Sequence, residues 1–444
     1  RAWNMAKLII KNCEVMTFEG QVLRFLPGQD ILIEGNQITA IQPTSPLAKE
    51  DYQIIDAAGM LAVPGMVNTH AHVPMVLFRN AGPDVNENDW FNKVIFPLEA
   101  NLTPEDIYWG AMLGLAEMIE AGITCVADHY FEMDRVAQAV EKAGTRANLG
   151  WAVFGHQGYS QLEETIRFVE RWQGRANGRI TTWLAPHSPY LCDPDFLKRC
   201  VKEAARLGVG NHIHVAETSG QVTLSLERYG KTPVQILADV GLLDQPAILA
   251  HCLYPSNEDL DLLVGKAVGI AQAPKTYMAM AMGLADLPKY LEKGIAVGLA
   301  TDGAVSSCTL DLFEQMRLTA LSQKDRAKDA EVMTVDTVLD LAFQGGARVL
   351  QQPRLGNLKA GNLADVVLLR QDRPALQPAI NKAANLVYSM DARDVDTVIC
   401  DGELVYQGGK HLTLDLGEIY REVNARLPHL LKKDLSRKIA DYPG

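Results

Sequence analysis

The chain has 444 residues, with 42 basic and 54 acidic side chains and a formal net charge of −12 at pH 7. This length exceeds the size at which one hydrophobic core stops growing, so we expect several folding units or one large barrel with an appended unit. The acidic balance and the lack of any Lys/Arg block argue against a nucleic-acid partner or an anionic membrane surface.

The cysteine spacing and the N-terminal residues favour a reducing compartment without export. Seven cysteines are scattered and never spaced as CxxC, which is typical of reduced thiols in a cytosol and disfavours metal binding by Cys. The chain has no signal-like N-terminal pattern, and no run of about 18 apolar residues that could cross a bilayer. We expect a cytoplasmic protein. We also expect Met5 to be the natural start, and residues 1–4 are left out of the fold prediction.

Three stretches of β-like alternation open the chain, and residues 64 to about 350 have a different pattern. Residues 8–18, 28–43 and 52–65 alternate apolar and polar side chains between turn signals, without a convincing helix. Apolar strands then alternate with helical patterns, most of which are closed by Gly. The strand candidates are residues 65–72, 123–130, 147–155, 179–187, 210–218, 247–252, 267–274 and 296–304. Eight such units predict an α/β fold, a (β/α)8 TIM-type barrel.

The β pattern returns near the C-terminus, after two helical segments at 310–324 and 335–350. Strands are predicted within 361–369 and 396–409. Since the chain termini of a domain often lie close together, we expect a small β-sandwich domain built from both chain ends, residues 5–63 and 353–413. The barrel then spans 64–352. Residues 414–444 are expected to form a C-terminal helix packed on the outside, from the amphipathic pattern LGEIYREVNARLPHLLKKDL.

Histidine and carboxylate side chains lie at the ends of several predicted strands. His70 and His72 close the first strand, where the period of two puts both on one face. His214 ends the fifth strand and Asp302 follows the eighth. Barrel enzymes keep their chemistry at the carboxyl ends of the strands, so these side chains are expected to converge on the barrel axis. Three imidazoles and a carboxylate suit one borderline divalent metal.

Other polar residues have two possible interpretations each. Glu217 could take a proton from water on the metal and pass it to a leaving amine or ring nitrogen, or it could cap the following helix. His251 closes the sixth strand and would point at the same water, or it is a core histidine. His187 ends the fourth strand and could contact substrate or be structural. His212 alternates with His214, so spacing alone does not decide between these two.

The fourth strand contains no Lys that could be carbamylated as a bridging ligand, so one metal is favoured over two. Taken alone, Asp302 would be read as an ordinary turn residue. The remaining histidines lack comparable neighbours in the sequence: His129, His156, His411 and His429.

The segments PGMVNTHAH, DHYF, APHSPYLC, HVAETSGQV, LAHC and TDGAVSSCTLDLFEQMR form a recognisable set. With them the chain resembles the amidohydrolase superfamily. The resemblance is to the branch that holds 5-methylthioadenosine/S-adenosylhomocysteine deaminases and chlorohydrolase-like s-triazine hydrolases. It runs over essentially the whole chain, including the late KAGNLADVVLL.

The resemblance implies a role for each polar residue at the strand ends. The implied ligands of a single zinc or iron are His70, His72, His214 and Asp302. Glu217 would carry a proton to the ring nitrogen of the substrate. His251 and Asp302 would orient and deprotonate the attacking water.

The resemblance also implies substrate contacts. Glu99, in WFNKVIFPLE, would hold the ribose hydroxyls, and His187 would contact the substrate. Some homologues hold the carboxylate of S-adenosylhomocysteine with two Arg. Arg146 matches the first of these, but Trp151 occupies the second position. Trp90 would cover the heterocycle.

Two segments depart from the deaminase pattern. The chain reads AQAPKTYMAMAMG at 271–283, where Thr276 and Tyr277 replace the usual Ser-Asn, and Ser307 and Cys308 replace an Asn pair. Both changes indicate a remodelled pocket floor.

We therefore expect a metal-dependent hydrolytic deaminase of an aminated N-heterocycle, most directly of thioether adenosine nucleosides, that releases ammonia. The alternative is a hydrolase of another aminated or halogenated ring, such as an s-triazine, a pterin or a guanine-like base. A remote alternative is a non-catalytic scaffold with this fold. Zinc is the expected metal, with iron or manganese also compatible with the ligand set. Apolar residues at 90–97 are consistent with a homo-oligomer.

Overall fold

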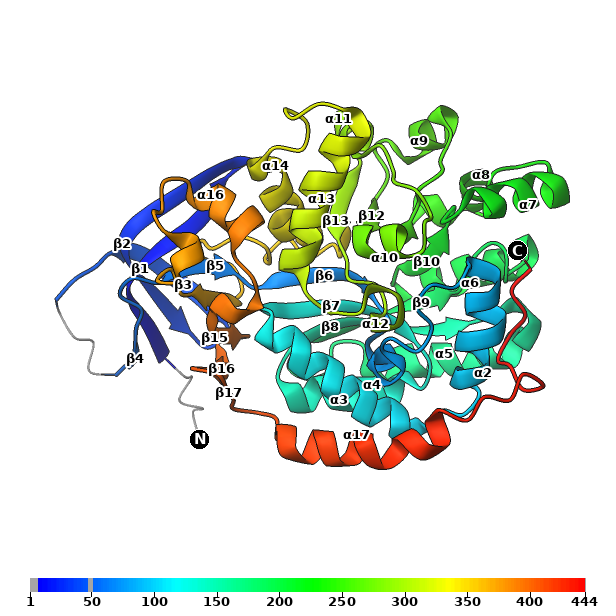
Figure 1. Ribbon diagram of the computed structural model, residues 1–444, viewed down its shortest axis with the longest axis horizontal. Helices are drawn as coiled ribbons and strands as arrows, with labels where there is room; N and C mark the ends of the chain where they lie inside the picture. The colour runs from blue at the N-terminus through cyan, green and yellow to red at the C-terminus, as the bar shows by residue number, and fades with distance from the viewer. Residues whose placement is uncertain (1–6, 47–50, 444) are drawn as a thin grey trace.

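The computed structural model describes residues 7–46 and 51–443, with all their side chains except those of residues 157–160. The expectation for Met5 lies outside these ranges. Among the described residues, eight parallel strands form one sheet that curls into a nearly closed barrel, as predicted (Figure 1). These strands are β6 (Met66–Ala71), β7 (Ile123–Tyr130), β8 (Arg146–Val153), β9 (Ile180–Pro186), β10 (Asn211–Val215), β11 (Ala247–His251), β12 (Val268–Gln272) and β13 (Ala296–Leu299).

Side-chain and loop hydrogen bonds join the first and last strands of the barrel. The Thr69 hydroxyl on β6 donates to the Leu299 carbonyl at 2.8 Å, and the Asp302 N–H donates to the His70 carbonyl at 3.0 Å. The strands are buried along nearly their whole length. This explains their continuous apolar runs, because a parallel sheet covered by helices has no solvent face.

Helices cover the outside of the barrel. They are α3 (Pro104–Glu120), α4 (Met133–Ala143), α5 (Gly158–Trp172), α6 (Pro194–Leu207), α7 (Ser219–Tyr229), α8 (Pro233–Asp239), α9 (Asn257–Leu263), α11 (Leu287–Glu292), α13 (Leu312–Ala327), α14 (Val335–Asp340) and α15 (Gly346–Val349). Short helices in the connections are η1 (Val73–Phe78), α1 (Glu87–Asp89), η2 (Trp90–Ile95), α2 (Phe96–Glu99), η3 (Gly155–Gln157), η4 (Leu242–Asp244), α10 (Pro274–Ala279), α12 (Ala304–Ser307) and η5 (Leu341–Gly345). Across the described part of the chain, none of the helices has the length and apolar character needed to cross a bilayer.

Local sequence explains where several helices begin and end. The Thr103 side chain accepts from the Asp106 N–H and the Asp106 carboxylate accepts from the Thr103 N–H, a capping box that starts α3. Asp193 caps α6 in the same position. Gly208 ends α6 with φ of +68°, a left-handed conformation that a residue without Cβ adopts at no steric cost.

The two chain ends meet in a second sheet beside the amino-terminal ends of the barrel strands, seen at the left of Figure 1. In the described residues this mixed sheet has nine strands. They are β1 (Lys7–Glu19), β2 (Val22–Glu34), β3 (Gln37–Pro43), β4 (Gln53–Asp56), β5 (Leu61–Pro64), β14 (Val366–Leu369), β15 (Val395–Cys400), β16 (Glu403–Gln407) and β17 (Lys410–His411). The pairing of β5 with β14 joins the N-terminal strands to the C-terminal ones.

A separate apolar cluster supports this second unit. It contains Ile10 and Val15 of β1 together with Val366 and Ile399 from the other chain end. Short helices interrupt the C-terminal strands: η6 (Pro374–Leu376), α16 (Lys382–Ala384), η7 (Asn385–Ser389) and η8 (Ala392–Asp394). We propose the domain limits given above, at 63/64 and 352/353, on this basis.

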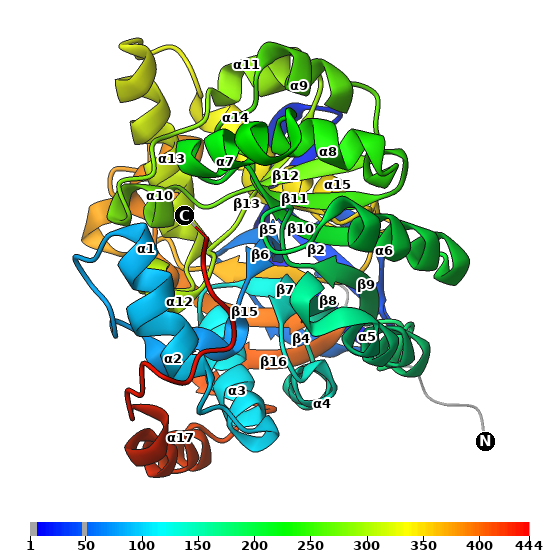
Figure 2. The same ribbon diagram turned by 90° about the vertical axis from the view of Figure 1, so that its right-hand side faces the viewer.

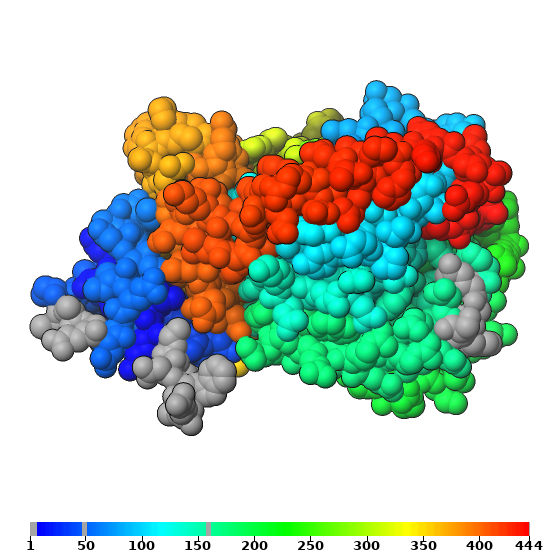
Figure 3. Space-filling view, turned by 90° about the horizontal axis from the view of Figure 1, so that it is seen from below, coloured from blue at the N-terminus to red at the C-terminus, as the bar shows by residue number. Residues whose placement is uncertain are grey.

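The C-terminal helix α17 (Leu416–Leu430) packs against α3 but is shorter than expected. Residues 431–443 do not continue it; they form turns and irregular backbone that run on from the end of α17, in the deepest red at the right of Figure 3. Pro428 lies in the last turn of α17 and donates no backbone hydrogen bond. The expectation of helix throughout residues 414–444 is therefore corrected.

Candidate active site

A cavity lies at the end of the barrel where the strands terminate, on the side that faces the viewer in Figure 2. The space between its lining atoms, with the solvent at its open mouth included, is about 680 Å³. Polar residues in its lining include His72, His129, His187, His214, His251, Glu99, Glu217 and Asp302. Aromatic residues in its lining include Trp90, Phe91, Phe96, Tyr130, Phe131, Phe154 and Tyr190. The cavity has the mixture of apolar walls and few polar groups that is common in small-molecule sites.

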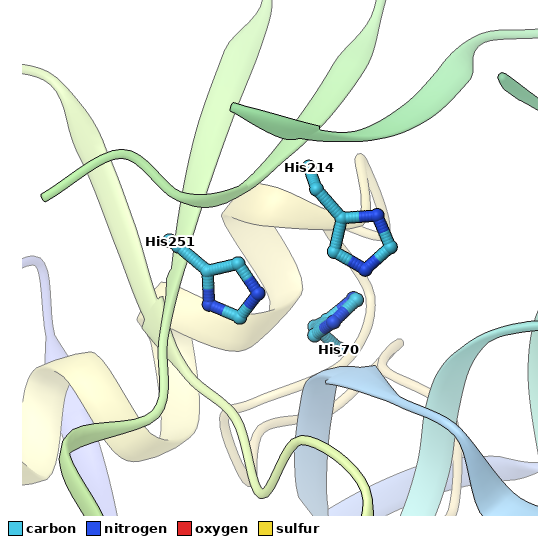
Figure 4. Close-up of side chains that lie close together, drawn as sticks. All are labelled: His70, His214 and His251. Carbon is cyan, nitrogen blue, oxygen red and sulfur yellow. The ribbon is translucent and has the colours of Figure 1, made fainter. Parts of the chain in front are cut away.

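Four side chains from three strand ends meet at the base of this cavity. Oδ1 of Asp302 lies 3.5 Å from Nε2 of His70 and 3.4 Å from Nε2 of His72. Nε2 of His214 lies 3.4 Å from Nε2 of His72. Figure 4 shows the rings of His70, His214 and His251 turned toward one shared space. The sequence predicted this convergence from strand ends alone.

The second nitrogen of each of these histidines is already bonded. Nδ1 of His72 donates to the His129 carbonyl at 2.5 Å, and Nδ1 of His214 donates to the His187 carbonyl at 2.7 Å. A carbonyl accepts only, so both rings carry the proton on Nδ1 and keep the Nε2 lone pair free. Second-nitrogen hydrogen bonds of this kind orient metal-ligating histidines.

The structure separates the two histidines of β10 that spacing could not. His212 does not line the cavity; its Nε2 lies 2.8 Å from Nδ1 of His70. Nε2 of His70 is buried and has no hydrogen-bond partner among the described residues. His214 belongs to the cluster with His70, His72 and Asp302, whereas His212 contacts His70 from the side away from the cavity. Burial lowers the pKa of His70 and that of His214, so both rings are neutral, which is the form that binds cations.

Glu217 and His251 lie side by side at the cavity wall. Oε1 of Glu217 is 3.5 Å from Nε2 of His251. Burial, followed by the nearby charges of Asp302 and Glu87, raises the pKa of Glu217 well above its usual value. Burial lowers the pKa of His251 to about 3. Burial alone would raise the pKa of Asp302, but the nearby rings of His70, His251 and His72 lower it. The cluster therefore places an ionised Asp beside a Glu that holds a proton more tightly than a free carboxyl does.

The backbone is strained where these residues lie. His251 has φ of 76° and Asp302 has φ of 59°, both in the left-handed region. Such conformations cost about 1–3 kcal/mol each for a residue with a side chain and cluster at functional sites. Both residues lie beside the cavity, at the end of β11 and just after β13.

The predicted substrate contacts Glu99, His187 and Trp90 also line the cavity. The Glu99 carboxyl accepts a hydrogen bond from the Tyr130 hydroxyl at 2.8 Å. Burial raises the pKa of Glu99 to about 8. Nδ1 of His187 lies 3.0 Å from the Ser188 hydroxyl. Nε1 of Trp90 is buried without a partner in the described part of the chain.

Arg146 lies elsewhere, which corrects the expectation that it contacts substrate. It is the first residue of β8, at the end of the barrel opposite the cavity. The residue is 6% exposed, and its guanidinium pairs with Asp365 at 3.0 Å and with Asp401. Trp151, which occupies the second Arg position, is also absent from the cavity lining. No Lys or Arg of the described chain lines this cavity.

Sequence reasoning missed His129 and did not foresee the contact of Tyr277. His129 has ring nitrogens close enough to those of His72 and His214 for the three to hold a cation, with ligand atoms within 4.8 Å of one another. It stands one residue before the end of β7, which was the signal overlooked. The Tyr277 hydroxyl lies 3.1 Å from Nδ1 of His251. Thr276 and Ser306, from the two segments that depart from the deaminase pattern, are joined by a hydrogen bond between their hydroxyls at 2.9 Å, and both line the cavity.

Comparison with known proteins agrees with this geometry. The family model described as "Amidohydrolase family" matches residues 61–405. The chain belongs to the amidohydrolase family. That match includes the barrel and reaches into the sheet formed by the chain ends.

Two curated relatives match over nearly their full length. The 5-methylthioadenosine/S-adenosylhomocysteine deaminase of Desulforudis audaxviator is 41% identical over 431 residues, which is 96% of this chain and 99% of that protein. The protein of the same name from Carboxydothermus hydrogenoformans is 42% identical, over 95% of this chain and 98% of that protein.

Solved structures show the same architecture. An adenosine deaminase from Xanthomonas campestris with bound zinc has a TM-score of 0.87 and 26% identity, covering 95% of this chain and 99% of the other. A triazine hydrolase from Arthrobacter aurescens also has a TM-score of 0.87, with 24% identity over 95% of this chain and 100% of the other. The second likeness establishes the fold alone.

Proposed function

We propose that this amidohydrolase is a hydrolytic deaminase of the purine ring of 5′-thioether adenosine nucleosides. The observation that carries this proposal is the cluster of His70, His72, His214 and Asp302 beside a buried Glu217 whose pKa is raised. The curated relatives with 41% and 42% identity carry the name of that activity. An aromatic cavity with a carboxyl group on its wall suits a nucleoside.

The residues at the base of the cavity fit a divalent cation. His72 and His214 keep their Nε2 lone pairs free, His70 has an unpartnered buried Nε2, and Asp302 is ionised. Such a His and Asp donor set is typical of zinc. When bound, the cation supplies the Lewis acidity that lowers the pKa of water toward neutrality. We propose these four residues as its ligands.

The protein's own groups then move the protons. Asp302 is ionised and accepts a proton from the attacking water, and His251 orients that water. Glu217, whose pKa is raised by burial, delivers its proton to the ring nitrogen next to the amino-bearing carbon. The water oxygen bonds to that carbon. The proton taken by Asp302 passes to the amino group, the carbon–nitrogen bond breaks, and ammonia leaves. The proton of the newly added hydroxyl returns to Glu217, which leaves a ring carbonyl and restores the starting form of the enzyme.

The cavity walls would hold the nucleoside. Glu99, fixed by Tyr130, is positioned to bond the ribose hydroxyls, and its protonated form can both donate and accept. Trp90 and Phe154 supply apolar faces for the purine ring, and His187 offers a neutral imidazole, because burial lowers its pKa to about 3.

One observation favours a second candidate, a hydrolase of another aminated or halogenated ring. The Thr276–Ser306 hydrogen bond ties together the two segments that depart from the deaminase pattern, and both residues line the cavity. A changed floor would suit a triazine, a pterin or a guanine-like base. The non-catalytic alternative has no support, because none of the proposed ligand positions has lost its His or Asp.

A substrate panel tests the proposal. Ammonia release is measured with zinc-loaded and manganese-loaded protein against methylthioadenosine, S-adenosylhomocysteine, adenosine, guanine, pterins and melamine. Turnover of the thioether nucleosides at the highest kcat/KM supports the proposal. Activity confined to free bases or triazines would reject it in favour of the second candidate.

The proposal extends to the metal, the compartment and the oligomeric state of the protein. Zinc is favoured by the donor set, with iron or manganese compatible with it. All seven cysteines are unpaired thiols, which favours a reducing compartment such as the cytoplasm. A homo-oligomer built near residues 90–97 remains a prediction, which the molar mass in solution would test.

A further inference from the structure

The segment that follows α17 ends beside the cavity. Figure 2 shows it in red, crossing α2 on the face where the strands terminate. Tyr442, near its end, is only 6% exposed. The Tyr442 N–H donates to Oδ1 of Asn92 at 3.0 Å, and Nδ2 of Asn92 donates back to the Tyr442 carbonyl at 3.2 Å. The segment is therefore held in register on η2, the helix that carries Trp90 and Phe91.

The ring of Tyr442 supports the aromatic wall of the cavity from behind. It stacks on Phe91 with 4.4 Å between ring centroids and 16° between planes. It also meets Tyr190 edge-on at 5.5 Å. Phe91 and Tyr190 both line the cavity, whereas Tyr442 does not. Aromatic pairs of this geometry contribute more than their buried area alone.

The hydroxyl of Tyr442 is connected to Glu217 by hydrogen bonds through Gln221. It donates to the Glu87 carboxylate and accepts from Nε2 of Gln221 at 3.2 Å. Oε1 of Gln221 in turn accepts from the backbone N–H of Glu217 at 3.0 Å. Gln221 thus uses both ends of its amide, and two hydrogen bonds connect the Tyr442 hydroxyl to the main chain of Glu217.

We propose that Tyr442 is a positioning residue for this active site, with its hydroxyl setting the backbone of Glu217 through Gln221 and its ring setting Phe91 and Tyr190. The inference rests on the proposed function for the role of Glu217. The contacts divide Tyr442 into two parts with separable effects. Loss of the hydroxyl acts on the proton-transfer step, whereas loss of the ring acts on the substrate-binding wall.

Two substitutions separate these effects. Tyr442→Phe keeps the stacked ring and removes the hydroxyl, so kcat falls roughly three- to tenfold, as for one lost hydrogen bond, while KM stays within about twofold. Tyr442→Ala also removes the ring, so KM rises in addition by roughly two- to tenfold. Both are measured on methylthioadenosine, together with the melting temperature of each variant.

A double-mutant cycle tests the route. If the hydroxyl acts through Gln221, then Tyr442→Phe has no further effect on kcat in a Gln221→Leu background. Gln221→Met keeps an unbranched side chain and replaces Leu if that variant unfolds. Tyr420→Phe is the matched control, because Tyr420 lies on α17 and is 51% exposed. Its kinetics should equal those of the wild type.

The inference is overturned if Tyr442→Phe has the kcat of Tyr420→Phe, or if its effect persists undiminished without Gln221. It is also overturned if Tyr442→Ala loses activity only in proportion to its folded fraction. Failure of the proposed function is a separate result, since the wild-type enzyme would then release no ammonia from nucleosides. In that case the kcat and KM of the same variants are measured on the substrate that the ammonia-release panel identifies.

Discussion

The hydroxyl of Tyr277 lies 3.1 Å from Nδ1 of His251, while the other nitrogen of that ring, Nε2, lies 3.5 Å from Oε1 of Glu217. Tyr277 is fully enclosed and also accepts a hydrogen bond from the Ala273 N–H at 2.9 Å. The Tyr277 side chain therefore holds the orientation of the His251 ring, as second partners of catalytic histidines do.

Tyr277→Phe should lower kcat by roughly tenfold and change KM little, because the His251 ring loses the partner of Nδ1. Steady-state kinetics and the pH profile of kcat measure this. Tyr290→Phe is the matched control. Its hydroxyl donates to the Cys252 carbonyl at 2.7 Å outside the cavity lining, so that variant loses stability without the same loss of kcat. A Tyr277→Phe enzyme with wild-type kcat and pH profile would contradict the account.

The two histidines of β10 should differ in their effect on metal binding. His214→Ala removes a proposed ligand and should abolish stoichiometric zinc binding. His212→Ala removes only the partner of His70 Nδ1 and should weaken zinc affinity by about 10–100-fold. Zinc content after dialysis and titration with a chelator measure both. His429→Ala on α17, whose side chain is 43% exposed, is the control and should bind zinc normally. The reverse order of effects would exchange the roles of His212 and His214.

The buried carboxyl of Glu99 should make stability depend on pH. Its pKa is raised from 4.5 to about 8 by burial, so the folded state binds a proton more tightly than the unfolded state. The contribution of Glu99 is therefore fully present below about pH 4.5 and is lost as pH rises to about 8. Glu99→Gln cannot ionise. Its melting temperature relative to wild type should rise between pH 5 and pH 9, and a constant difference over that window would refute the assignment.

Substrates with an uncharged 5′ substituent should be preferred. No Lys or Arg lines the cavity among the described residues, and Arg146 pairs with Asp365 at the opposite end of the barrel. Burying the amino-acid carboxylate of S-adenosylhomocysteine without a cation is costly. We expect kcat/KM for methylthioadenosine to exceed that for S-adenosylhomocysteine by at least about tenfold. Equal values would show that another group recognises the carboxylate.

The barrel and the residues at the base of its cavity were largely predictable from the sequence. Strand ends could be located from apolar runs, and in a parallel barrel all those ends lie on one face, so His70, His214 and Asp302 were predictable as neighbours. His212 and His214 were not separable, since the pleat repeats every two residues, and only the depth of each side chain in the barrel distinguishes them.

Contacts between residues far apart in the chain could not be predicted from sequence patterns. Tyr442 and Asn92 are 350 residues apart, and no periodicity links them. The pairing of Tyr277 with His251 depends on the loop after β12, whose path the sequence pattern does not define. For Arg146 the motif match and the strand position disagree. Arg146 is the first residue of β8, and that position by itself indicates the end of the barrel opposite the cavity.

The measurement that most directly tests the central claim is product analysis for wild type and Glu217→Gln in water enriched in heavy oxygen. The account predicts that zinc-loaded wild-type enzyme converts methylthioadenosine to its 6-oxo product, with one heavy oxygen in the ring carbonyl and one ammonia released per product. Glu217→Gln should bind zinc and nucleoside normally yet form product at least about 100-fold more slowly. Wild-type turnover by Glu217→Gln, or a product without solvent oxygen, would contradict the account.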